Sequence, residues 1–206
     1  MRNILLISIN LLIAATLSAI PTDSLFVKMP DKILPTLSQK QRFELAEYFK
    51  AGKADSVPNL FGRNTILQKY DTANCHIVLK TSLTGLTEIK RIIISENKTL
   101  IGIIQTVNQP FKISNIQFFT ENWQPYRLVV NFPELNSWIN EKKQTDSGVD
   151  SAWIKNLLRK SVFSMNFNDS NELEIENNVL NTLSTEDKKL IEPIFENKKI
   201  SVKIQN

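Results

Sequence analysis

Short β-branched segments, separated by turns too short to hold a helix, constrain the fold of this chain more than any other feature. From about residue 65 the apolar residues recur with a period of two, which is typical of strands. A parallel crossover needs a dozen or more residues, whereas gaps such as Glu96-Asn97-Lys98 are far shorter. The pattern therefore predicts an antiparallel β-meander. Its expected strands cover residues 66–70, 75–81, 88–95, 100–107, 116–119 and 126–132.

A helix is predicted before the meander. Ser38 and Gln41 have the spacing of a capping box, in which each side chain binds a backbone N–H of the first turn. Leu45, Ala46 and other apolar residues then follow at helical spacing, and Gly52 provides a left-handed stop. The helix should run to about residue 51.

The C-terminal part predicts a further small group of elements. Residues 163–167 and 172–176 both alternate between apolar and polar side chains around a short polar turn, which is typical of a hairpin. Pro193 should end the helix that begins at Ser184. We expect short helices at 133–139 and 151–158, a surface loop at 140–150 and a last strand at 200–204.

The expected fold class is α+β: an antiparallel β-meander packed with N-terminal helices, plus a C-terminal β-hairpin, helix and strand. We expect residues 1–19 to be a signal peptide and residues 20–206 to form a single domain. Two subdomains, at about 20–132 and 133–206, are the alternative.

The signal-peptide prediction rests on Arg2, the apolar stretch 4–17 and the small residues Ser18-Ala19. The stretch is shorter than the ~20 residues of a membrane span. A lipid anchor would require a cysteine after it, and the single cysteine is Cys75. We therefore expect a periplasmic or secreted protein without lipidation and without a stable membrane span after cleavage.

Charge and cysteine content narrow the classes of partner. The formal charge is +4, and the lysines are scattered among acidic residues. Nucleic-acid binding needs a concentrated basic surface, so we expect no nucleic-acid partner. One cysteine cannot form an internal disulfide, which suits an exported bacterial protein.

The adjacent Cys75 and His76 are the only residues of their types. On a strand, neighbouring side chains point to opposite faces, so the two should not form a nucleophile–base pair. We expect Cys75 to be buried and His76 to be half-exposed. The chain also lacks the glycine-rich and Cys-x-x-Cys motifs of common cofactor and metal sites, and we predict no cofactor, no metal site and no catalytic residue.

Glu172, Glu174 and Glu176 form a row on the second strand of the predicted hairpin. Two carboxylates can hydrolyse a glycosidic bond, and several can hold a hard cation. The simpler interpretation is a solvated strand face, balanced by Lys199 and Lys203 across the sheet.

Trp123 lies in a predicted connection between strands, and Met29 and Pro30 begin a connector that runs to Leu37. Aromatic residues in loops can bind carbohydrate or protein, although core packing is the alternative role. We choose Trp123, Met29 and Pro30 as the predicted binding residues.

Short motifs spread over most of the chain also point to a known family. They are residues 29–37 (Met-Pro-Asp-Lys-Ile-Leu-Pro-Thr-Leu), Arg42, Tyr48, Val57, Asn59, Gly62, Phe118-Phe119, Trp123-Gln124-Pro125, Thr185-Glu186-Asp187 and Pro193. In these positions the chain resembles a family of exported Bacteroidetes proteins of unknown function. The resemblance implies a cell-envelope location and a single α+β unit, and it implies no activity.

The sequence thus favours a non-catalytic binding or interaction module whose partner is an envelope protein or a glycan. A sheet edge or a pocket would provide the binding surface. A carboxylate-based glycan hydrolase is the alternative.

Overall fold

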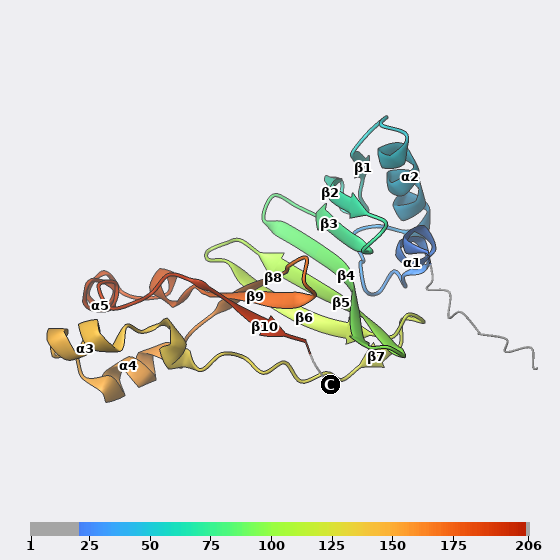
Figure 1. The fold of residues 1–206 in the computed structure, drawn as a ribbon. Helices are drawn as coiled ribbons and strands as arrows, with labels where there is room; N and C mark the ends of the chain where they lie inside the picture. Colours follow the sequence, from blue (N-terminus) through green and yellow to red (C-terminus); the bar gives the residue numbers. More distant parts are fainter. Residues whose placement is uncertain (1–20, 205–206) are drawn as a thin grey trace, which may run out of the picture.

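The described part of the chain, residues 21–204 in a computed structural model, consists of two antiparallel sheets with helices at both ends (Figure 1). The predicted α+β class is confirmed. The expected signal peptide lies outside the described residues. No helix within residues 21–204 is long and apolar enough to cross a membrane.

Two helices cover one face of the larger sheet: α1 (Thr22–Lys28) and α2 (Gln39–Lys50). The predicted capping box of α2 is present, because the Ser38 side chain accepts from Gln41 N while the Gln41 side chain accepts from Ser38 N. Leu45 and Ala46 are buried against the sheet. This packing explains the position of α2.

The larger sheet is the predicted meander, in which every strand pairs antiparallel with the next strand along the chain. Its seven strands are β1 (Ser56–Pro58), β2 (Asn64–Asp71), β3 (His76–Lys80), β4 (Gly85–Ser95), β5 (Lys98–Val107), β6 (Ile113–Phe119) and β7 (Pro125–Tyr126).

The strand predicted at residues 126–132 is wrong beyond its first residue. β7 ends at Tyr126, and the chain then continues without strand pairing as far as η1 (Leu135–Trp138). Leu128 and Val130 are nevertheless half-buried in the core between the two sheets, while Val129 is exposed. The alternation in the sequence therefore reports side-chain packing rather than backbone pairing.

The smaller sheet contains the predicted hairpin and the predicted last strand. Its order is β10 (Lys199–Lys203), β9 (Glu172–Asn177) and β8 (Phe163–Phe167), with both pairs antiparallel. Leu173 and Ile175 of β9 point into the core.

Short helices lie at the end of the molecule opposite α1 and α2 (Figure 1). They include α3 (Glu141–Ser147), where a loop was predicted. Asn140 caps α3 by accepting from Lys143 N, and Gly148 ends it with a φ of 68°. The predicted stop before Pro193 is confirmed. The remaining elements are α4 (Ser151–Leu158), η2 (Val179–Asn181) and α5 (Thr185–Ile191).

Three clusters of buried apolar side chains hold these layers together. Cluster 1 lies between α1, α2 and the larger sheet, cluster 2 lies between the two sheets, and cluster 3 joins the short helices. The larger sheet therefore has a core on each of its faces, and each core is closed by a different part of the chain.

Candidate functional site

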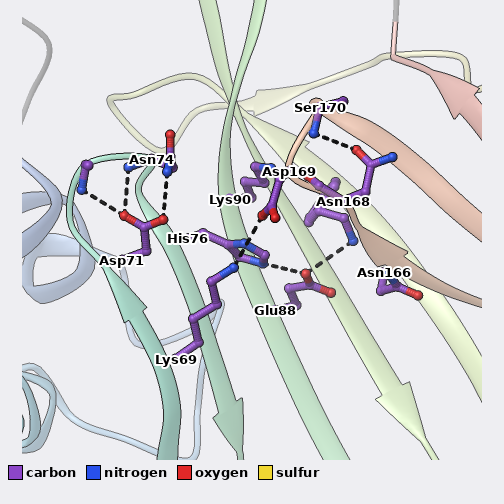
Figure 2. Close-up of polar contacts among 12 residues, drawn as sticks. Lys69, Asp71, Asn74, His76, Glu88, Lys90, Asn166, Asn168, Asp169 and Ser170 are labelled. Carbon is purple, nitrogen blue, oxygen red and sulfur yellow. Dashed lines mark hydrogen bonds and ion pairs between the residues drawn. The ribbon is translucent and has the colours of Figure 1, made fainter.

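A group of buried polar side chains lies between the larger sheet and the β8–β9 hairpin (Figure 2). His76 on β3 and Glu88 on β4 are 4% and 5% exposed, and their Nε2 and Oε1 atoms are 2.6 Å apart. Lys90 lies directly across from His76 in the strand register and is 1% exposed. Strand alternation places all three on the face that the hairpin covers.

Glu88 joins the two sheets. Besides the imidazole of His76, its Oε1 atom accepts a hydrogen bond of 3.2 Å from the backbone N–H of Phe167 on β8. An ionised carboxylate can only accept, so His76 donates through Nε2. The Ser114 side chain on β6 accepts in the same way from the N–H of Met165, at 3.0 Å. Side chains of the larger sheet thus satisfy N–H groups at the outer edge of β8.

Lys90 holds the tip of the hairpin, because its ammonium group donates to the carbonyl of Asn168. Burial lowers the pKa of Lys90, although the nearby Asp169 carboxylate opposes this shift. Asp169 also forms an ion pair of 3.5 Å with Lys69 on β2. Lysines from β2 and β4 therefore both bind the turn between β8 and β9.

The prediction of a half-exposed His76 is wrong. The β8–β9 hairpin covers the imidazole, and its Nδ1 atom is buried with no hydrogen-bond partner among residues 21–204. Local alternation could not reveal this, because the covering residues follow about ninety positions later in the chain.

Cys75 and His76 do lie apart, as predicted. Cys75 is fully buried in cluster 1, in the turn before β3 and with a positive φ of 46°. Burial raises the pKa of its thiol. The thiol and the imidazole occupy opposite faces of the sheet and do not form a nucleophile–base pair.

The carboxylates of β9 form a paired strand face. Asn168, Asn166 and Ser164 of the hairpin donate to Glu172, Glu174 and Glu176 over 3.0, 2.9 and 3.3 Å, respectively. On the other side, Lys199 lies 3.5 Å from Glu174. The balanced face expected from the sequence is therefore present. Within residues 21–204, no three or more His, Cys, Asp or Glu side chains are arranged to hold a metal ion.

The predicted binding residues lie mainly in the core. Trp123 is 7% exposed and Met29 is 1% exposed, and the structure brings both into cluster 1. Trp123 packs against Phe119 with ring centroids 5.9 Å apart. Pro30 is half-buried. Trp123 and Met29 stabilise the fold, and a binding role for these residues stays a prediction.

Two surfaces of the protein were not predicted from the sequence. One is a groove of about 400 Å³ between β6 and the unpaired chain after β7, which the predicted strand pairing had hidden. The other consists of exposed apolar residues in turns, such as Phe61 and Leu83. Apolar residues inside Gly- and Ser-containing turns are the signal that could have identified the second surface.

Comparison with known proteins supports the fold. The family described as "Protein of unknown function (DUF3256)" matches residues 14–206. A solved structure, "Structure of a domain of an uncharacterized protein from Porphyromonas gingivalis W83", is similar with a TM-score of 0.69 and 22% sequence identity. The similarity covers 87% of this chain and 91% of that chain. A search of curated proteins found no match.

Proposed function

This chain belongs to the DUF3256 family of proteins of unknown function, and from that premise we propose that it is an exported, non-catalytic interaction module of the bacterial cell envelope. The leader pattern in residues 1–19 supports export. The groove beside β6 supports binding and carries the proposal.

The groove lies along an incomplete sheet edge. On one side β6 pairs with β5 over its whole length, but on the other side β7 pairs only with Phe118 and Phe119. The chain then runs along β6 without joining it and leaves the space open. The groove is lined by Ile116, Gln117, Phe118, Phe119, Pro125, Tyr126, Arg127, Leu128, Val130 and Phe132.

An extended peptide fits this geometry. Added as a strand, it would bind the main chain of β6 and place alternate apolar side chains against the aliphatic and aromatic lining. We propose that the partner is an envelope protein with such a segment.

The use of the buried polar groups supports a non-catalytic role. Glu88 binds His76 and Phe167, while Lys90 binds the hairpin turn. A general acid or base must reach the substrate, and these groups are enclosed between the sheets. Their contacts serve to join the two sheets.

Site-specific photocrosslinking tests the proposal. A photoreactive amino acid at Gln117, exposed in the groove, is expected to capture an extended segment of one envelope protein. The matched control carries the same group at Asn97, an exposed residue of the β4–β5 turn. Equal adducts at both positions, or release of glycan fragments by the purified protein, would contradict the proposal.

A further inference from the structure

One end of the larger sheet presents turns that the proposed peptide groove does not involve. In a meander, every second turn lies at the same end, which here brings together the turns β1–β2, β3–β4 and β5–β6 (Figure 1). Hydrogen bonds connect them: the Asn59 side chain donates to Thr81 O over 3.3 Å, and Asn108 N donates to Thr84 O over 2.9 Å. We call this end the turn face and define it as residues 59–64, 80–85 and 107–113.

The turn face exposes large apolar side chains. Leu60, Phe61 and Leu83 are 58%, 68% and 81% exposed, and Val107 and Ile113 are also exposed. Isolated exposed apolar residues are common, but here they recur on neighbouring turns.

The turns hold these side chains in an ordered frame. The Asn59 Oδ1 atom accepts from the backbone N–H groups of Phe61 and Arg63, at 3.0 and 3.1 Å. The Ser82 hydroxyl accepts from Gly85 N at 2.7 Å. Such hydrogen bonds between a side chain and the nearby backbone fix the conformation of a turn. The exposed apolar residues therefore lie on turns of defined conformation.

The charge of the turn face has one sign. Its ionisable residues are Arg63, Lys80 and Lys112, and it contains no Asp or Glu. The turns at the opposite end of the same sheet include Asp71, Glu96 and Glu121. Among the turns of this sheet, acidic residues therefore occur at the other end and not in the turn face.

Arg63 and Lys80 also line a hollow of about 490 Å³ together with Leu83. The other lining residues, Asn64, Ile66, Ser82 and Thr84, are uncharged. The hollow thus places two cations beside exposed apolar side chains, an arrangement suited to an amphipathic anion.

We propose that the turn face docks on a lipid bilayer that contains anionic phospholipids. Phe61, Leu60 and Leu83 enter the boundary between headgroups and acyl chains, and the three cations remain at the level of the phosphates. This combination of apolar insertion and basic side chains is the physical basis of peripheral membrane binding. Charge complementarity selects the anionic bilayer as the partner.

Vesicle sedimentation tests this inference. A chain of residues 20–206 retains all three core clusters, and it is mixed with phosphatidylethanolamine vesicles with or without phosphatidylglycerol. We expect binding to the phosphatidylglycerol vesicles, weakened by salt. The double variant Phe61→Ser with Leu83→Ser should lose at least about tenfold in affinity for these vesicles, since both apolar anchors are lost.

Matched variants separate docking from misfolding. Ile93→Ser with Val129→Ser removes two exposed apolar residues outside the turn face, at 62% and 71% exposure, and should bind as the parent does. Arg63→Glu with Lys80→Glu should lose the preference for phosphatidylglycerol. All variants should retain the parent's circular dichroism.

Absence of vesicle binding, equal binding to both vesicle types, or binding unchanged by the turn-face variants would overturn the proposal. Capture of an acidic protein through this face, without vesicle binding, would also overturn it. Crosslinking at Gln117 is independent of these results, so failure of the lipid proposal remains distinguishable from failure of the peptide groove.

Discussion

Glu88 is a single carboxylate on which two donors from separate parts of the fold converge, and it shows how one residue joins the two sheets. His76 donates from the neighbouring strand and Phe167 donates from the smaller sheet. Loss of this acceptor would leave two buried donors without a partner. A buried unpaired donor costs more than an ordinary hydrogen bond contributes.

We therefore expect Glu88→Ala to lower the free energy of unfolding by about 3 kcal/mol. Glu88→Gln retains an oxygen acceptor and should recover part of the loss. Urea unfolding followed by circular dichroism measures both values. Glu186→Ala, on the exposed first turn of α5, is the control and should change stability little; an equally small effect at Glu88 would contradict the role of this residue.

Lys90 predicts a specific dependence of stability on pH. Its folded pKa is lowered by burial, whereas the unfolded side chain titrates near its ordinary value of 10.5. Between these two pKa values the unfolded state binds more protons, so stability rises with pH in that window. Below the window both states are protonated, and the cost of burying the charge is fully present.

Lys90→Met should remove this rise. We expect the difference in unfolding free energy between parent and variant to grow in favour of the parent as the pH rises toward 10.5. Urea titrations at neutral pH and just below 10.5 measure it, and subtracting the variant cancels the titration of tyrosines and other lysines. A difference that is constant with pH would contradict the assignment.

The positions of some individual side chains could be predicted from the sequence, and others could not. The separation of Cys75 from His76 was predicted from strand alternation, although Cys75 lies in the turn before β3 rather than on the strand. The contacts of His76 and Glu88 did not, because they depend on which element covers that face of the sheet. Trp123 was predicted correctly to lie in a connection between two strands, but a loop position does not reveal that its side chain turns into the core.

Among the elements, Arg42 of α2 fixes the path of the connector from α1. It is 1% exposed, and its guanidinium donates to the carbonyls of Phe26 and Val27 and to the Asp31 carboxylate. The planar guanidinium group has several N–H donors that can bind these acceptors at the same time. A lysine ammonium group cannot reproduce this arrangement of donors.

Arg42→Lys should therefore destabilise the fold by about 3 kcal/mol, because buried carbonyls lose their donors. Urea unfolding measures the change. Lys40→Arg, on the exposed side of the same helix, should have little effect and serves as the control. Comparable stability of the two variants would count against the anchoring role.

β5 and β8 meet at Gly102, where the absence of a side chain makes room for an aromatic ring. A Cβ at this position would lie 2.5 Å from Cζ of Phe167 and 2.7 Å from Cδ1 of Ile92. Close packing leaves no space to absorb such an overlap. Gly102 thus sets the distance between the two sheets.

Gly102→Ala should destabilise the protein by about 1–3 kcal/mol through overpacking. The double variant with Phe167→Leu, which removes the ring, should lose less stability than the sum of the two single variants. A double-mutant cycle by urea unfolding measures this coupling. Simple additivity would show that the two residues do not interact.

Elements were predictable where their own sequence decides them. The capping box and the short turns of the meander required only neighbouring residues. The segment 127–132 alternates like a strand, yet its pairing depends on whether β6 is within reach. The helix α3 was not predicted, because none of its residues is buried and no apolar periodicity marks it in the sequence.

For the molecule as a whole, cluster 2 should make unfolding cooperative. It combines Ile92 and Ile104 of the larger sheet with Met165 and Phe167 of the smaller one. Neither sheet can expose its share of this cluster without disrupting the other, so we expect one unfolding transition across the two sheets.

The three tryptophans can test this prediction, because Trp123 lies in cluster 1, Trp138 lies in cluster 2 and Trp153 packs against cluster 3. Three variants each retain one tryptophan, and the other two are replaced by Phe. In each variant, the fluorescence of the remaining tryptophan should change at the same urea concentration as the circular dichroism. An earlier transition at Trp153 alone would show that the short helices form a separate unit.

The hydrogen bond from Phe167 to Glu88 also bears on the order in which the protein folds. The strands of the meander contact their sequence neighbours, whereas this bond joins residues 79 positions apart. Local contacts form early and distant ones late, so the meander should assemble before the hairpin docks. Substitutions at Glu88 should then accelerate unfolding while leaving the refolding rate nearly unchanged, as stopped-flow kinetics would reveal.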